Sequence, residues 1–152
     1  RSLSQCRQSR EKDSVVLILD TSGSCSHLSH FFSAIADAAV QYGDVELYTA
    51  PNACLESRRD KSGWKYIGEG RDSFGWERFR NRTIIFFGDF DGGDAPVLAS
   101  RQNKVYWFSC EGGRYQDMDE HHWCLYTLSD FRGKYYNCES EDDFLRLAKK
   151  VR

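Results

Sequence analysis

The chain has 152 residues, of which 40% are apolar and 14% aromatic, and its formal net charge at pH 7 is −2. This length suits one domain that buries roughly two-thirds of its unfolded surface, and the apolar content argues against disorder. The charge gives no broad basic field for nucleic acid or an anionic membrane, and no apolar run approaches the ~20 residues of a membrane helix. We therefore expect a globular domain without a nucleic-acid or membrane partner.

The chain opens with a polar segment, residues 1–13, which we interpret as a lead-in or linker to one domain spanning 14–152. A strand is predicted from Ser14 to Leu19, because consecutive apolar residues are typical of a strand buried on both faces. A helix is predicted next, from about His27 to Tyr42, where apolar residues recur at helical spacing. Strand, turn and helix in this order form the first half of a βαβ unit.

The middle of the chain is predicted to hold a second strand and a short hairpin. Residues 44–49 alternate between apolar and polar side chains, which indicates a strand. Two short edge strands, 54–56 and 64–67, are expected to pair through the turn between them. A short helix is expected from Phe74 to Arg80.

The pattern of the first strand recurs farther along the chain. Thr83–Gly88 is another apolar strand that runs directly into an aspartate, Asp89. A short helix is expected from Pro96, since proline favours a first helical turn, and a closing helix is expected with Ser140 as its cap. Further strands are predicted at 104–110, 125–128 and 134–137, with a loop at 111–123.

Strands that alternate with helices indicate a mainly parallel sheet covered on both sides. The predicted fold class is therefore α/β, a three-layer α/β/α sandwich with a mostly parallel, doubly wound central sheet of the Rossmann-like kind. In such a sheet, ligands bind beyond the carboxyl ends of the strands, at the point where the strand order reverses.

Candidate metal ligands gather at this end of the predicted sheet. Asp20 follows the first strand, and Ser22 and Ser24 come two and four residues later. Asp89 follows the second aspartyl strand, so both carboxylates reach one crevice if the two strands are neighbours. Carboxylate and hydroxyl oxygens suit Mg²⁺ or Mn²⁺ better than zinc or copper. The same loop is also good turn and helix-capping chemistry, which is the purely structural alternative.

The segment Asp20-Thr21-Ser22-Gly23-Ser24 resembles the DxSxS signature of von Willebrand factor A domains. In that family the aspartate and both serines belong to a metal-ion-dependent adhesion site. An aspartate after a later strand also contributes, and Asp89 corresponds to it. The family usually reads Thr-Asp-Gly there, whereas this chain has Gly88 before the aspartate and Phe90 after it.

A second stretch carries the resemblance as well. The family completes its site with a threonine from a Gly-Gly-Thr-Asp-Phe segment, which residues 68–74 resemble. Asp72 stands at the threonine position, and the adjacent Ser73 is the possible substitute. An additional carboxylate would change the charge at the ion.

The resemblance implies binding rather than catalysis, with an acidic side chain of a partner protein completing the coordination of Mg²⁺ or Mn²⁺. It is closest to compact intracellular members related to bacterial metallopeptidase-like and cobalt-chelatase-like proteins, which often work beside an AAA+ ATPase. We therefore expect a cytoplasmic, non-enzymatic protein-binding domain. Its expected metal ligands are Asp20, Ser22, Ser24 and Asp89, with Asp72 or Ser73 as a fifth.

Two alternatives stay open at this point. A haloacid-dehalogenase-like phosphohydrolase would use Asp20 as its nucleophile, although such enzymes want a second acidic residue two places on, where this chain has Ser22. A secreted adhesion module would pair the six cysteines in disulfides. The wide, irregular cysteine spacing favours free thiols in a reducing compartment instead.

Overall fold

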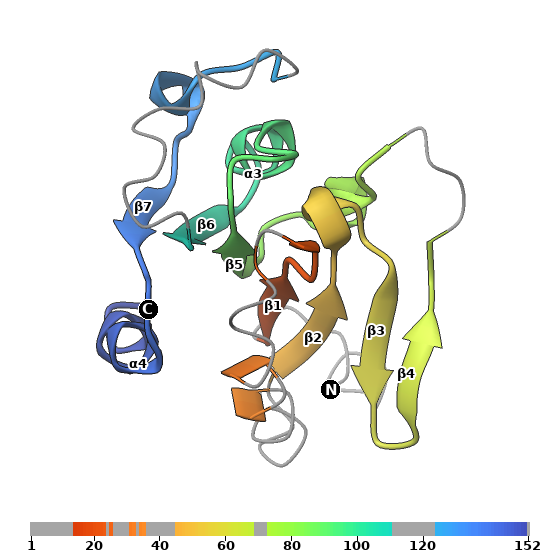
Figure 1. The fold of residues 1–152 in the computed structure, drawn as a ribbon. Helices are drawn as coiled ribbons and strands as arrows, with labels where there is room; N and C mark the ends of the chain where they lie inside the picture. The colour runs from red at the N-terminus through yellow and green to blue at the C-terminus, as the bar shows by residue number, and fades with distance from the viewer. Residues whose placement is uncertain are drawn as a thin grey trace, which may run out of the picture.

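The structure is a computed structural model that describes residues 14–23, 25, 31–32, 34–35, 45–68, 73–110 and 124–151. Seven strands in this part of the chain form one sheet in the order β4-β3-β2-β1-β5-β6-β7 (Figure 1). The strands are β1 (Val15–Leu19), β2 (Val45–Thr49), β3 (Ser57–Asp60), β4 (Gly63–Tyr66), β5 (Thr83–Gly88), β6 (Lys104–Ser109) and β7 (Lys134–Asn137). The α-helices with defined bounds are α3 (Asp94–Ala99) and α4 (Glu141–Ala148), and short 3₁₀ helices are η2 (Pro51–Ala53), η3 (Trp76–Arg78) and η5 (Leu128–Asp130).

The centre of the sheet is parallel, and β1 lies between β2 and β5. Leu19, the last residue of β1, is opposite Thr49 on one side and Phe87 on the other. The chain passes from β1 to one side for β2 and later returns to the other side for β5, so the strand order reverses around β1. The two aspartyl strands are therefore neighbours, which is the condition under which both carboxylates were expected to reach one crevice.

Both faces of the sheet carry a hydrophobic core, as the continuous apolar strands predict. Val16 and Ile18 of β1 belong to one cluster, and Leu17 and Leu19 to another, because successive strand side chains point to opposite faces. The first cluster also holds residues of η3 and α3, and the second holds residues of α4. Helices α3 and α4 accordingly lie on opposite sides of the sheet (Figure 1).

Aromatic rings fill the core beside β5 and β6. The fully buried Trp107 has Phe86, Phe90 and Tyr135 around it, with ring centroids 5.4–5.7 Å away. Its indole N–H donates to the carbonyl oxygen of Gly88 at 3.2 Å. Burying a tryptophan without a partner for this N–H would be unfavourable, so the bond fixes the ring against the end of β5.

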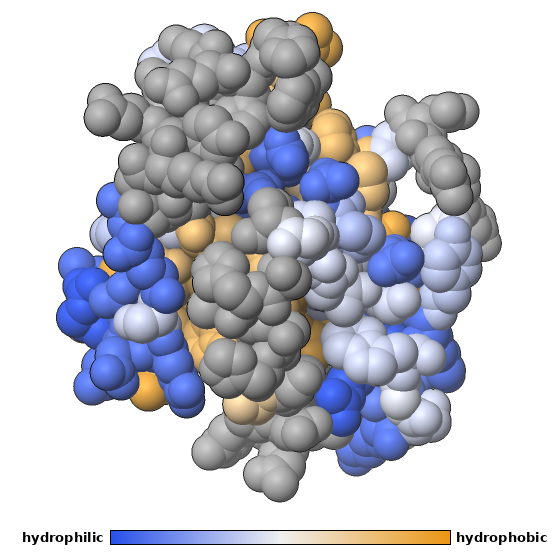
Figure 2. Space-filling model, viewed as in Figure 1, coloured by the Kyte–Doolittle hydropathy of each residue, from blue (hydrophilic) through white to orange (hydrophobic). Residues whose placement is uncertain are grey.

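The antiparallel edge of the sheet is the predicted hairpin, with shifted bounds. Strands β3 and β4 pair from Ser57–Tyr66 to Asp60–Gly63, so the first arm begins three residues later than predicted. Much of this edge is hydrophilic at the surface (Figure 2). The helix predicted from Phe74 is only the 3₁₀ turn η3, which Gly75 precedes with a left-handed φ of 86°.

Five other predictions are corrected by the structure or fall wholly or partly outside the described residues. Residues 125–128 do not form a strand, because the backbone N–H groups of Leu125 and Tyr126 donate to the Asp94 carboxylate at 2.9–3.0 Å instead. Helix α3 begins at Asp94 rather than at Pro96. Of the predicted helix 27–42, only residues 31–32 and 34–35 are described, and these are helical. Residues 1–13 and 111–123 lie outside the described part of the chain.

The closing helix α4 follows its sequence signals. The Ser140 hydroxyl accepts a hydrogen bond from the Asp143 N–H at 3.1 Å, and the Asp143 carboxylate accepts one from the Glu139 N–H at 3.1 Å. These bonds satisfy N–H groups that have no partner inside a helix. Among the helices that the structure describes, none is long and apolar enough to cross a membrane.

Candidate functional site

The candidate site begins with Asp20, which lies fully buried at the carboxyl end of β1. Its Oδ1 accepts hydrogen bonds from the backbone N–H of Ser22 at 2.8 Å and of Asn52 at 3.2 Å. Its Oδ2 is buried and has no hydrogen-bond partner among the described residues. Natural proteins seldom bury a carboxylate oxygen without a partner, so this atom points to something that binds there.

Asp89 brings a second carboxylate to the same place. It follows β5 directly and is 3% exposed, and its Oδ1 accepts a hydrogen bond from the Asp91 N–H at 3.0 Å. The β1–β5 register places Asp20 level with Gly88, and a backbone bond from the Asp20 N–H to the Phe87 carbonyl extends the pairing at 2.8 Å. The two acidic side chains are therefore placed together by the sheet itself.

The proximity of these two groups changes the chemistry of Asp20. The pKa of Asp20 is raised to about 6, because burial and, to a lesser extent, the nearby Asp89 charge outweigh the hydrogen bonds from Ser22 and Asn52 that lower it. Two carboxylates in one buried place repel each other when both are ionised. A divalent cation between them would relieve both the repulsion and the lost hydration.

Gly88 makes this approach possible. A Cβ atom at this position would lie 2.8 Å from the Asp20 Cβ and 2.5 Å from the Phe86 ring. Any larger residue therefore pushes the Asp20 side chain or the ring away.

A thiol is the third polar group of the site. One carboxylate oxygen of Asp20, one of Asp89 and the Cys25 Sγ lie within 4.8 Å of one another, and all three residues are buried. The Cys25 Sγ also lies 2.7 Å from the Cys110 Sγ. A soft sulfur beside two hard oxygens widens the range of metals that the donor atoms suit toward zinc.

The structure brings only some of the predicted metal ligands together. Asp20, Ser22 and Asp89 come together, and Ser22 also hydrogen-bonds Asp20 through its side chain. Ser73 is exposed and lines a hollow with Leu55, Tyr66, Gly68 and other residues that include none of these three. Ser24 and Asp72 lie outside the described residues.

A cleft of about 360 Å³ lies next to residues that contact the acidic pair, although neither Asp20 nor Asp89 lines it. Asn52 lines it and also donates its N–H to Asp20. Cys54 lines it as well, and burial together with the Asp20 charge raises the pKa of this thiol. Asp91 contributes a further acidic group to the wall.

Three features of the site escaped prediction from the sequence. Asn52 is in the left-handed region at φ 50°, a conformation that no pattern in the sequence predicted. Gly92 also has a left-handed φ, and a Cβ there would lie 2.1 Å from the Asn52 carbonyl oxygen, so the two loops press closely together. The contact between Cys25 and Cys110 spans 85 residues, for which no local pattern exists.

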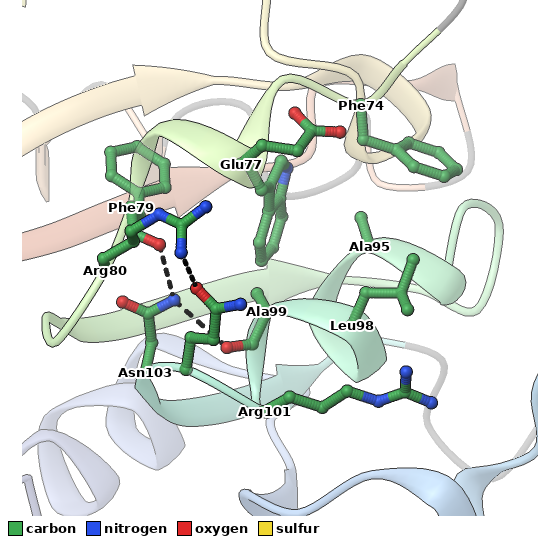
Figure 3. Close-up of a pocket in the computed structure, with 11 residues that line it drawn as sticks. Phe74, Glu77, Phe79, Arg80, Ala95, Leu98, Ala99, Arg101 and Asn103 are labelled. Atoms are coloured by element: carbon green, nitrogen blue, oxygen red, sulfur yellow. Dashed lines mark hydrogen bonds between the residues drawn. The ribbon is translucent and has the colours of Figure 1, made fainter.

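A second hollow lies away from the acidic pair. It measures about 300 Å³ between η3 and α3 (Figure 3). Arg80 donates to the Gln102 side chain at 2.8 Å, and Asn103 donates to the Phe79 and Ala99 carbonyls. These bonds join its two walls, and neither Asp20 nor Asp89 lines it. The side chains of Arg80, Gln102 and Asn103 thus hold η3 against the end of α3.

Comparison with known proteins gives no relative. No family model matches the chain, and neither a curated protein nor a solved structure matches it significantly. The class that the fold and site define is an α/β domain with a mostly parallel sheet and a buried acidic pair at its carboxyl edge.

Proposed function

We propose that this chain is a metal-ion-dependent protein-binding domain of the von Willebrand factor A type. In this proposal Asp20, Ser22, Ser24 and Asp89 hold Mg²⁺ or Mn²⁺, with Asp72 or Ser73 as the fifth ligand. An acidic side chain of a partner protein completes the coordination. The observation that carries the proposal is the buried Asp20 Oδ2, which has no hydrogen-bond partner in the described chain and lies beside a second buried carboxylate.

The donor atoms fit a hard divalent cation. Two carboxylates supply the charge that balances the ion, and the Ser22 hydroxyl already lies within hydrogen-bonding distance of Asp20. Magnesium is usually bound by few protein carboxylates and keeps several waters, one of which an oxygen of a partner protein can replace. The neighbouring Cys25 thiol suits zinc better, so the metal test includes zinc with a Cys25→Ser variant.

The fold expected of this type is a three-layer α/β/α sandwich. Support for three layers comes from the two hydrophobic clusters on opposite faces of the sheet, one packed with α3 and the other with α4 and the helical residues 31–32. A doubly wound sheet binds ligands where the strand order reverses. Asp20 and Asp89 follow the two neighbouring strands at that reversal.

The metal part of the proposal is tested by thermal unfolding in EDTA and in MgCl₂, MnCl₂ or ZnCl₂. A ligand that binds only the folded chain stabilises it by mass action, by about 1.4 kcal/mol at ten times its Kd. We expect Tm to rise with Mg²⁺ or Mn²⁺, and the rise to vanish in Asp20→Ala and Asp89→Ala. Asp142→Ala, an exposed aspartate of α4, is the matched control and keeps the response.

A Tm that stays constant across millimolar metal, or that rises equally in Asp20→Ala, would exclude a metal site at the acidic pair. A response to zinc alone that disappears in Cys25→Ser would replace the magnesium site with a zinc site. Turnover of a generic phosphate ester that is lost in Asp20→Asn would favour the phosphohydrolase.

The binding part is tested by affinity capture with the tagged chain in Mg²⁺ and in EDTA. An AAA+ ATPase is the first candidate partner, on the strength of the family resemblance. The captured protein should be released by EDTA, fail to bind Asp20→Asn, and lose binding when its own acidic contact residue becomes an amide. Capture that persists in EDTA would contradict metal-dependent binding, whatever the result with metal alone.

A further inference from the structure

Two buried cysteines meet behind the acidic pair. The Cys25 Sγ and Cys110 Sγ lie 2.7 Å apart, and the two residues are 0% and 7% exposed. Both are free thiols in the structure, joined by an S–H···S contact. The sulfurs of a disulfide lie about 2.05 Å apart, so only a small movement of the two side chains separates this pair from a covalent bond.

The backbone holds each cysteine in place. The Cys25 N–H donates to the Ser22 carbonyl at 3.0 Å, and the Cys110 N–H donates to the Gly88 carbonyl at 3.3 Å. Cys25 therefore belongs to the loop that follows β1, while Cys110 directly follows β6 at the end of its pairing with β5. The sheet topology brings the two positions together, although 85 residues separate them.

The other described cysteines have different surroundings. Cys124 Sγ donates to the Phe90 carbonyl at 3.4 Å, and Cys138 Sγ donates to the Ser140 carbonyl at 3.8 Å. Cys54 lines the cleft beside the acidic pair. Within the described chain, the sulfur–sulfur contact at hydrogen-bonding distance is that of Cys25 with Cys110.

We propose that Cys25 and Cys110 form a disulfide by exchange with a small-molecule disulfide such as oxidised glutathione. One protein thiolate attacks a glutathione sulfur, which breaks the glutathione S–S bond and releases one glutathione. The second thiolate attacks the resulting mixed disulfide and releases the other glutathione. The protein pair loses two electrons to the glutathione disulfide, and the released thiolates take up the two protons. The bond ties the loop carrying Ser22 to the end of β6.

We expect the folded pair to react slowly, because both cysteines are buried and thiol–disulfide exchange requires access to the reacting sulfurs. Oxidation is therefore carried out during refolding of the full chain, in a mixture of reduced and oxidised glutathione. A portion refolded with excess reductant gives the reduced form for comparison.

The readout is the mass of the chain and its peptide map after alkylation in denaturant. We expect the oxidised chain to lose two of its six alkylatable thiols and the map to contain a Cys25–Cys110 linked peptide. The cross-link closes a long loop of the unfolded chain, so Tm should exceed that of the reduced form by roughly 5–15 °C.

Variants locate the bond and control for misfolding. Cys25→Ser and Cys110→Ser should each abolish the linked peptide and the rise in Tm, whereas Cys54→Ser should retain both. The linked peptide is identified in the wild-type chain itself, so the test remains decisive even if a variant fails to fold. Six alkylatable thiols after oxidative refolding, or a linked peptide joining other cysteines, would overturn the proposal. Neither outcome depends on metal, so a failure of the disulfide proposal is distinguishable from a failure of the proposed function.

Discussion

At the scale of single residues, the acidic pair has two opposing effects, one on ligand binding and one on stability. Asp20 and Asp89 are buried side by side, which suits the binding of a cation and weakens the fold when no cation is bound. Each carboxylate receives backbone hydrogen bonds at Oδ1, from Ser22 and Asn52 in one case and Asp91 in the other. These bonds hold the side chains in position for a ligand.

The titration of Asp20 should appear in the stability of the metal-free protein. Burial raises its pKa to about 6, against about 3.9 in an unfolded chain. The folded state therefore binds more protons between about pH 4 and pH 6, and the free energy of unfolding falls as pH rises through this window. At pH 7 without metal, Asp20→Asn should stabilise the fold by up to about 3 kcal/mol.

Urea unfolding of both proteins in EDTA, from pH 4 to pH 7.5, measures this effect. The free energy of unfolding of the wild type should fall with rising pH relative to that of Asp20→Asn, and the two values should converge near pH 4. Asp142→Asn, on the exposed face of α4, should run parallel to the wild type. An Asp20→Asn chain that is the less stable at pH 7 would show that the carboxylate is needed for folding even without metal.

The Gly88 contact gives a second prediction at this scale. Gly88→Ala adds a Cβ that would overlap the Phe86 ring and the Asp20 side chain, and overpacking of this kind costs about 1–3 kcal/mol. Urea unfolding should detect the loss. Gly23→Ala is the control, because no described atom lies within 4 Å of its added Cβ. Equal stability of the two variants would show that β5 shifts without cost.

At the scale of elements, strand ends and helix ends carry the decisive polar contacts. Arg82 directly precedes β5 and donates to the Glu46 carboxylate of β2 at 2.7 Å and to the Ser14 hydroxyl before β1 at 2.8 Å. These bonds join the starts of the three central parallel strands. Asp20 and Asp89 follow the opposite ends of two of these strands. The Arg82–Glu46 ion pair and the candidate metal ligands therefore lie at opposite ends of the parallel strands.

The capped start of α4 is open to a simple test. Ser140→Ala removes the oxygen that accepts the Asp143 N–H, and loss of such a cap costs about 1 kcal/mol. Ser140→Asp should keep most of the stability, because aspartate caps as well as serine. Chemical unfolding of the three proteins provides the measurement. A Ser140→Ala chain as stable as the wild type would mean that water replaces the cap.

At the scale of the whole molecule, the sheet is stabilised from two sides. Adjacent residues of β1 enter different clusters, Ile18 with Trp76 and Phe86 on one face and Leu17 with Phe87 on the other. A sheet with one face in water would bury only alternate residues of a strand. The stability of the molecule therefore depends on the packing of both faces of the sheet.

Alanine substitution on the two faces tests that dependence. Ile18→Ala and Leu17→Ala should each lower the free energy of unfolding by about 2–5 kcal/mol, because each leaves a cavity in a packed core. Thr21→Ala, at an exposed position just beyond β1, should change it by less than about 0.5 kcal/mol. A large loss for one core variant and a negligible loss for its neighbour would show that one face is not tightly covered.

Local patterns in the sequence determined much of this protein. Apolar runs predicted β1, β5 and β6, and hydroxyl and acidic residues predicted the start of α4. The position of Asp20 and Asp89 after matching strands indicated a shared crevice on the condition that the two strands are neighbours. These signals were reliable because each depends on a few consecutive residues and on the geometry of one element. The predicted strand at 125–128 was wrong because its outcome depends on a residue far away in the sequence. Its backbone N–H groups donate to the Asp94 carboxylate.

Only the tertiary structure decided what surrounds the acidic pair. It brought Asn52 to Asp20 across 32 residues and Cys110 to Cys25 across 85, and it left Gly88 no room for a side chain. Such contacts arise from strand order and loop packing, to which every part of the chain contributes. The sequence by itself determined which groups carry the candidate chemistry, and the assembled sheet decided which of them meet.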